Sequence, residues 1–139
     1  MSRKVEIVEV GPRDGLQNEA KALSVEERLE FIARLEAAGA RRIEAVSSVN
    51  PRLVPQMAGA EAVMAALPHK PDRSRIGLVL NGKGWERLKS TRCDEANVVV
   101  CATDSFGLKN QGAATAQQIE AMHAIAADRA ARRGPRGRR

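Results

Sequence analysis

The chain has 139 residues, of which 43% are hydrophobic and 2% aromatic, so it can form one domain with an aliphatic core. No run approaches the roughly 18 apolar residues of a membrane span, and the polar opening Met1-Ser2-Arg3-Lys4 predicts a cytoplasmic protein with no membrane partner. Six of the 23 basic residues are arginines in residues 129–139, and the other 17 are balanced by 17 acids, so nucleic-acid binding is not expected.

The hydrophobic periodicity alternates between strands and helices along residues 1–128. Residues 5–10 predict a first, buried strand, and Ser24 with Glu27 forms a capping box for a helix that Gly39 closes. Further strands are predicted at 42–46, 75–80 and 96–102, a loop at 51–57, and helices at 60–67, at 83–90 and from Thr115 onward. The last helix is expected to bury one face, formed by Ile119, Met122, His123 and Ala126.

Beyond this domain, residues 129–139 predict a disordered Arg/Gly/Pro tail, because such a composition cannot bury a core. The two cysteines, Cys93 and Cys101, are too few for a disulfide framework and are not in a CxxC pair, so they predict buried, reduced thiols.

Four βα units in succession predict an α/β fold with a parallel sheet, either a doubly wound open sheet or the N-terminal half of a (β/α)8 TIM barrel. Polar side chains gather at the carboxyl ends of the predicted strands, and this favours the barrel, where strand ends converge on one face. The first turn also lacks the G-x-G-x-x-G of a dinucleotide-binding fold. These polar residues are Arg13, Asp14, Glu44, Ser47, Ser48, Asn81, Thr103, Asp104 and Ser105.

The turn after the first strand, Gly11-Pro-Arg-Asp-Gly15, contains the side chains best suited to bind a metal or an anion. A carboxylate at Asp14 could hold a divalent metal, a guanidinium at Arg13 could bind an anionic oxygen, and the amide of Gln17 could orient a ligand. The alternative for Arg13 and Asp14 is an ordinary surface ion pair. Likewise, Glu44 could be a solvated strand residue, and Asn81 could only form a turn with the glycine that follows it.

Five segments together resemble the 3-hydroxy-3-methylglutaryl-CoA lyases, metal-dependent carbon–carbon lyases built on a (β/α)8 barrel. The likeness covers roughly residues 4–128. The segments that carry it are Glu9-Val-Gly-Pro-Arg-Asp-Gly-Leu-Gln-Asn-Glu19, Arg42-Ile-Glu44 with Ser47 to Pro51, Val54-Pro-Gln-Met57, Leu80-Asn-Gly-Lys-Gly84, and Ala102-Thr-Asp-Ser-Phe106 with Lys109-Asn110.

The resemblance implies cleavage of 3-hydroxy-3-methylglutaryl-CoA to acetyl-CoA and acetoacetate with Mg²⁺ or Mn²⁺ as cofactor. It implies that Asp14 is a metal ligand and that Arg13 stabilises the enolate oxygen. The full set of residues implied for the site comprises Arg13, Gln17 and Glu44 as catalytic residues, Asp14 for the metal, and Asn81, Ser47, Lys109 and Asn110 for the acyl-CoA substrate. Lys109 and Asn110 are expected on a loop at the rim, after the fourth strand.

The family also uses a His-x-His pair and a cysteine in a glycine-rich loop, whereas this chain has only His69 and His123, and neither cysteine lies in such a loop. One hypothesis is therefore a half-barrel shortened by a frameshift or early stop, with little activity alone. A second is a half-barrel that regains activity by pairing with another copy or with a complementing C-terminal half. A third is a non-catalytic remnant that binds acyl-CoA or metal, or that binds polyanions through the arginine tail.

Overall fold

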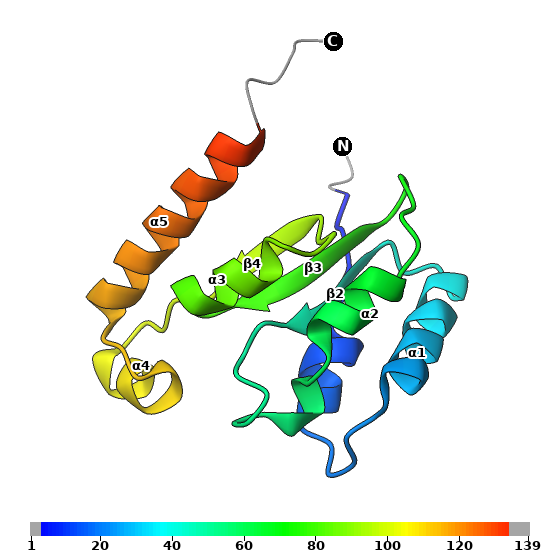
Figure 1. The fold of residues 1–139 in the computed structure, drawn as a ribbon, viewed down its shortest axis with the longest axis horizontal. Helices are drawn as coiled ribbons and strands as arrows, with labels where there is room; N and C mark the ends of the chain where they lie inside the picture. The colour runs from blue at the N-terminus through cyan, green and yellow to red at the C-terminus, as the bar shows by residue number, and fades with distance from the viewer. Residues whose placement is uncertain (1–3, 134–139) are drawn as a thin grey trace.

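In the computed structural model, which describes residues 4–133, four parallel strands form one sheet in the order β1-β2-β3-β4. The strands are β1 (Val8–Glu9), β2 (Arg42–Ser47), β3 (Ser74–Val79) and β4 (Glu95–Val98). Each strand pairs with its neighbour in sequence, as successive right-handed βα crossovers produce in a barrel wall (Figure 1). The four predicted strands are therefore present, parallel and in chain order.

One face of the sheet is covered by helices, and the hydrophobic core lies between them. The helices are α1 (Val25–Ala37), α2 (Ala60–Ala66), α3 (Gly82–Leu88), α4 (Asp104–Gln111) and α5 (Thr115–Arg133). Two short helical turns, η1 (Gly11–Gly15) and η2 (Pro55–Met57), precede α1 and α2. The core joins Ile32 of α1, Val63 of α2 and Trp85 of α3 to Val46 and Val79 of the sheet. The helix α5 lies alongside α3 (Figure 1).

The opposite face of the sheet is polar, because alternate residues of β2 and β4 point there. Arg42, Glu44, Glu95 and Asn97 line a hollow of about 410 Å³ on this side. Arg42 donates a hydrogen bond to Glu95 at 3.0 Å. In a closed barrel this face is the interior, so the polar residues mark the concave side of the sheet.

Local sequence signals explain where α1 begins and ends. Both bonds of the predicted capping box are present: Ser24 Oγ accepts from the Glu27 amide at 3.1 Å, and Glu27 Oε2 accepts from the Ser24 amide at 2.8 Å. The helix closes at Gly39, whose φ of 103° is a conformation that glycine adopts without steric cost.

The first and fourth strands are shorter than the sequence predicts. The first contains only Val8 and Glu9, and Val5 and Ile7 are 86% and 81% exposed, so the expectation of a buried strand over residues 5–10 is wrong. Strand β1 is an edge strand that pairs only with β2, and no described residue covers its other side. The fourth strand ends at Val98 instead of residue 102, one residue after Asn97 turns toward the concave face.

Three predictions about the C-terminal part also need correction. Residues 104–111 form α4, capped by Thr103, where a loop was expected. Helix α5 continues to Arg133, so the first five residues of the predicted tail are helical, and residues 134–139 lie outside the described range. The buried face of α5 contains Gln118 and Ile125 and leaves Ile119 39% exposed, because the helix turns this stripe toward α3 and the chain leading into α4.

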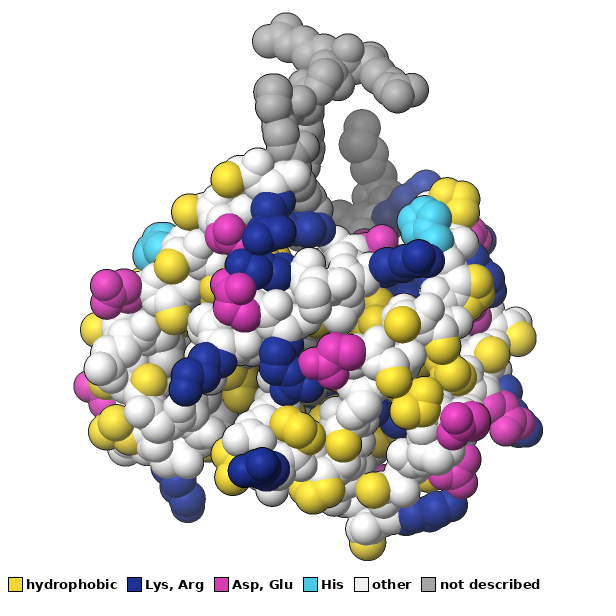
Figure 2. Space-filling view, in the orientation of Figure 1, with side chains coloured by type: hydrophobic (Ala, Val, Ile, Leu, Met, Phe, Trp, Pro, Cys, Tyr) yellow, Lys and Arg dark blue, Asp and Glu magenta, His cyan; other side chains and the backbone are white. Residues whose placement is uncertain are grey.

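The surface carries no large field of one sign on the face seen in Figure 2, where basic and acidic side chains are interspersed. Both cysteines are free thiols, and Cys101 is buried whereas Cys93 is partly buried. Within residues 4–133, no helix is both long enough and apolar enough to cross a membrane.

Candidate functional site

The turn η1 presents Arg13 and Asp14 at the carboxyl end of β1. Three successive amides, those of Arg13, Asp14 and Gly15, converge on the Val10 carbonyl at 3.1, 2.8 and 3.4 Å. This π-type turn widens the backbone, a feature frequent at functional sites. A Cβ on Gly11 would lie 2.9 Å from a Glu9 carboxylate oxygen, so a larger residue would displace the side chain that accepts from the Gly11 amide at 2.7 Å.

Arg13 lies at the centre of a row of four polar side chains. Its Nε donates to Glu44 Oε1, and one terminal nitrogen donates to Asp14 Oδ1 at 2.9 Å. Glu44 Oε2 accepts from Asn97 Nδ2 at 3.0 Å. The row therefore runs from the first turn across the concave face to β4, and it joins residues that are 31 and 53 positions apart in sequence.

The exposed fraction of the side chains increases along this row from Glu44 to Asp14. The side chains of Glu44, Arg13 and Asp14 are 3%, 15% and 57% exposed. The buried carboxylate fixes the guanidinium, while Nη2 of Arg13 and Oδ2 of Asp14 have no hydrogen-bond partner among residues 4–133. One cationic donor and one anionic acceptor are thus left without a described partner, and Glu44 is a buried residue and not a solvated one.

Asn97 is the member of the row that sequence reasoning missed. It lies in the run Ala96-Asn-Val-Val-Val-Cys101, which reads as an apolar buried strand. The signal was present, since an amide in such a strand needs a hydrogen-bond partner. The identity of that partner, Glu44, depends on the curvature of the sheet and was not visible in the sequence.

The donor set offers a divalent cation a single carboxylate. Oδ2 of Asp14 is a hard oxygen ligand of the kind that Mg²⁺ and Mn²⁺ prefer. Glu44 uses both of its oxygens within the row. No group of three or more His, Cys, Asp or Glu side chains within residues 4–133 could enclose a metal. The chain fits one ligand of a site that substrate oxygens or further groups must complete.

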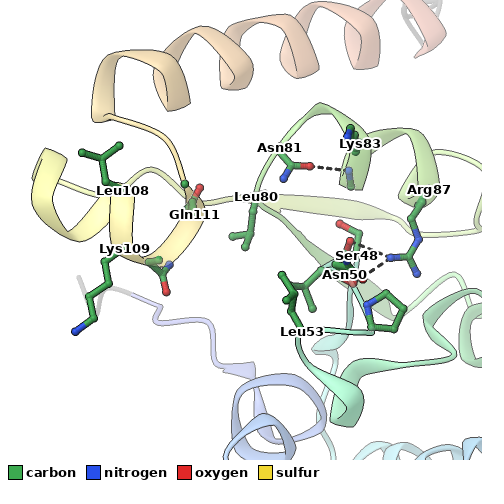
Figure 3. Close-up of a pocket in the computed structure, with 15 residues that line it drawn as sticks. Ser48, Asn50, Leu53, Leu80, Asn81, Lys83, Arg87, Leu108, Lys109 and Gln111 are labelled. Carbon is green, nitrogen blue, oxygen red and sulfur yellow. Dashed lines mark hydrogen bonds between the residues drawn. The ribbon is translucent and has the colours of Figure 1, made fainter.

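A cavity of about 830 Å³ opens at the same end of the sheet. One wall is α4, the opposite wall is the segment after β2, and the chain between β3 and α3 closes the back (Figure 3). Two rim residues, Leu53 and Leu108, are 77% and 56% exposed. The principal lining side chains are Ser48, Asn50, Leu53, Leu80, Asn81, Lys83, Arg87, Leu108, Lys109, Asn110 and Gln111.

The sequence-predicted substrate residues are distributed unevenly about this cavity. Asn81, Lys109 and Asn110 line it, although Lys109 and Asn110 are on α4 and not on the expected loop. Asn81 also caps α3 by accepting from the Gly84 amide at 2.9 Å, so it is more than a simple turn residue. Ser47 is fully buried and accepts from the Val49 amide, away from the lining.

Gln17, the remaining predicted residue, is half-buried just after η1 and makes no hydrogen bond to the described residues. Its amide is therefore not committed to the fold, unlike the amide of Asn97.

Arg87 was not anticipated, and it holds the wall of the cavity formed by the segment after β2. It makes a two-pronged ion pair with Glu61 of α2 at 2.6 and 3.0 Å and donates to the carbonyls of Ser48 and Val49 at 3.2 and 3.0 Å. The hydrogen bond raises the pKa of Arg87 and lowers that of Glu61. Both charges are therefore occupied in fixing the wall.

Comparison with known proteins assigns this architecture to a family. The HMGL-like family model matches residues 4–133. The chain belongs to the HMGL-like family. A hydroxymethylglutaryl-CoA lyase of Pseudomonas mevalonii is 44% identical over 106 residues, 76% of this chain and 35% of that protein. A 3-hydroxy-3-isohexenylglutaryl-CoA/hydroxy-methylglutaryl-CoA lyase of Pseudomonas aeruginosa is 37% identical over 120 residues, 86% of this chain and 40% of that protein.

Among solved structures, an HMG-CoA lyase from Acinetobacter baumannii in complex with coenzyme A and 3-methylmalate matches with a TM-score of 0.82 and 32% identity. The match covers 86% of this chain and 39% of that one. The chain thus spans about two fifths of the length of these relatives, and its four βα units correspond to the N-terminal part of the HMG-CoA lyase barrel. The predicted family and fold are both confirmed.

Proposed function

We propose that this member of the HMGL-like family carries the arginine-bearing part of a lyase site that cleaves 3-hydroxy-3-methylglutaryl-CoA to acetyl-CoA and acetoacetate. The observation that supports it is the row Asp14–Arg13–Glu44–Asn97 at the carboxyl end of the sheet. A buried carboxylate holds a guanidinium whose remaining donor faces outward, which is a preorganised site for a developing oxyanion.

Arg13 acts on the charge that the reaction creates. Cleavage breaks the C2–C3 bond: the C3 hydroxyl loses its proton, its oxygen becomes the ketone of acetoacetate, and the bonding pair moves to C2. The resulting thioester enolate takes a proton at C2 and becomes acetyl-CoA. Nη2 of Arg13 has no partner among residues 4–133 and donates to the enolate oxygen. Electrostatic donors of this kind contribute roughly 3–4 kcal/mol to the transition state.

Glu44 serves as a positioning residue for Arg13. Both of its oxygens are occupied, by Arg13 and Asn97, and its side chain is 3% exposed. A buried carboxylate that two donors hold in this way fixes the direction in which the Arg13 guanidinium points. Gln17, whose amide is uncommitted, orients the substrate beside the turn, and Ser47 supports the backbone beneath it.

Asp14 would hold a divalent metal, Mg²⁺ or Mn²⁺, through Oδ2. When bound, the metal would supply a positive charge that attracts the oxygens of the substrate. One carboxylate is a partial site, so a complementing C-terminal half would supply the other ligands. The free thiols agree with a reducing, cytoplasmic setting.

The 830 Å³ cavity receives the coenzyme A portion of the substrate. Lys109 and Asn110 on α4 offer a cation and an amide to phosphate or amide groups, and Asn81 offers its amide nitrogen from the opposite side. The apolar rim residues Leu53 and Leu108 contact the pantetheine chain or the adenine. A drug-sized ligand needs a pocket of roughly 300–1,000 Å³, which this cavity satisfies.

Metal binding is tested with Mn²⁺ by electron paramagnetic resonance on the full 139-residue chain. Asp14→Asn should weaken Mn²⁺ binding at least tenfold. Asp72→Asn is the matched control, because Asp72 is also a half-exposed aspartate paired with an arginine, and its variant should bind as the wild type does. Equal Mn²⁺ affinity in Asp14→Asn and the wild type would exclude the metal role.

Substrate binding is tested by calorimetric titration with coenzyme A. Lys109→Ala should weaken binding several-fold, whereas Lys21→Ala, a similarly exposed lysine remote from the cavity, should not. Acetoacetate release from 3-hydroxy-3-methylglutaryl-CoA then separates two functions. Turnover abolished by Arg13→Gln supports a lyase. Coenzyme A binding without turnover, alone or with an added complementing half, supports a non-catalytic acyl-CoA-binding protein.

A further inference from the structure

Arg28 of α1 is a buried guanidinium with no carboxylate partner in the described part of the chain. Its side chain is 0% exposed, and burial lowers its pKa. Nη1 donates to the Ala58 carbonyl at 2.8 Å and Nη2 to the Ala45 carbonyl at 3.4 Å, while Nε is buried without a partner. The other buried arginine, Arg75, by contrast has the carboxylate of Glu36 at 2.7 Å.

The two carbonyls that Arg28 contacts bracket one continuous segment, residues 45–58. Ala45 lies where the β2–β3 ladder slips by one residue, since Glu44 pairs with Ile76 and Val46 pairs with Gly77. Such a bulge redirects the neighbouring side chain and often lies next to a functional site. Ala58 ends the turn η2, so one guanidinium fixes both ends of the segment.

That segment builds both parts of the candidate site. It begins one residue after Glu44, which holds Arg13. It then forms the cavity wall with Ser48, Asn50 and Leu53. A displacement of either end would therefore move the carboxylate that orients the site arginine, the wall opposite α4, or both.

An apolar side chain would fill this position at lower energetic cost. Burying a guanidinium that has only two neutral acceptors carries a desolvation penalty of several kcal/mol. A methionine side chain has no hydrogen-bond donor, so it could not hold the carbonyls of Ala45 and Ala58 as Arg28 does. A buried arginine at this cost is explained if it is needed to hold residues 45–58 in place.

We propose that Arg28 is a positioning residue that clamps residues 45–58, and thereby sets Glu44 against Arg13 and the Ser48–Leu53 wall against α4. Its functional meaning rests on the proposed lyase function, whereas the clamp itself is a property of this chain's fold.

The test compares Arg28→Met and Arg28→Lys with the wild type by hydrogen exchange. The amides of Leu53, Val54, Met57 and Ala58 are hydrogen-bonded within the segment, so their exchange is measurable. In Arg28→Met these amides should exchange at least tenfold faster, while those of β3 stay within twofold. Arg34→Met, at an exposed position on the same helix, is the control and should change neither.

Coenzyme A affinity provides the functional readout. In Arg28→Met it should fall at least fivefold, and Arg28→Lys, which keeps the charge and reaches one carbonyl, should recover part of the loss. Uniform acceleration of exchange throughout the chain, or unchanged exchange in residues 45–58, would overturn the clamp. If Arg28→Met does not fold, the same pattern is required of Arg28→Lys. If the wild type binds no coenzyme A, the proposed function fails, and the exchange data still decide the clamp.

Discussion

Replacing Glu44 probes the row at its most buried member. Its carboxylate accepts from Arg13 through one oxygen and from Asn97 through the other, and its side chain is 3% exposed. Glu44→Ala removes both bonds and leaves Arg13 with Asp14 as its only described ion-pair partner. We expect this substitution to be among the more destabilising ones at the carboxyl end of the sheet.

The magnitude follows from burial. Breaking a fully buried ion pair costs about 3–5 kcal/mol, because the remaining charge loses its compensation. Arg13 is 15% exposed and keeps Asp14, so the lower end applies, and we expect Glu44→Ala to lower the free energy of unfolding by about 3 kcal/mol. For a domain of this size the melting temperature should fall by about 10 °C. Glu44→Gln retains an acceptor and should cost about 2 kcal/mol.

Urea unfolding followed by circular dichroism measures these changes, and a double-mutant cycle with Arg13→Ala isolates the pair. The coupling energy should be about 2 kcal/mol. Glu61→Ala is the control, because its pair with Arg87 is nearly half exposed and should contribute under about 1 kcal/mol. A Glu44–Arg13 coupling below about 0.5 kcal/mol would refute the view that a buried carboxylate fixes the arginine.

Three further outcomes are expected. Gly77→Ala should lower the free energy of unfolding by about 1–3 kcal/mol in urea titrations. The reason is that the new Cβ would lie 2.9 Å from Leu88 Cδ2 and 3.1 Å from Cys93 Sγ. Unchanged stability would mean that Leu88 repacks freely. Burial raises the pKa of Cys93 to about 12 from 9.0, so stability should decline as pH rises from 9.0, and iodoacetamide should label this thiol far more slowly in the native chain than in urea. The hydrogen bond from Arg87 lowers the pKa of Glu61 below 4.5, so its stabilisation is present above that pH and lost as pH falls further; Glu61→Gln should flatten the acid limb of a melting-temperature profile.

Interactions between residues close together in the chain could be predicted from the sequence. The capping box of Ser24 and Glu27 and the glycine at 39 defined α1, because each interaction joins residues at most three positions apart or depends on one residue's own φ. Arg13, Asp14 and Glu44 were identified as site residues from their positions at strand ends, and the structure brings these three together.

The features that the sequence did not reveal depend on distant neighbours. Val5 and Ile7 read as a buried strand, but a strand is buried only if partners cover it, and β1 is an edge strand. The burial of Arg28 was not predicted, because it arises from the carbonyls of Ala45 and Ala58, 17 and 30 residues away. Helix α4 was missed because its sequence has little amphipathic pattern and contains Gly107, although Thr103 offered a capping signal.

The row at the concave face shows which part of the proposed site this chain builds. Glu44 on β2 and Asn97 on β4 meet across β3, although strands two apart are separated by roughly 9–10 Å. The two side chains reach toward each other across this spacing, and Asn97 Nδ2 lies 3.0 Å from Glu44 Oε2. The orientation of the Arg13 guanidinium is therefore set by residues of this four-stranded sheet. In the proposed function, Asp14 is the one metal ligand among residues 4–133, so a complementing half that completes the site should raise metal affinity strongly and leave the Arg13–Glu44 coupling unchanged.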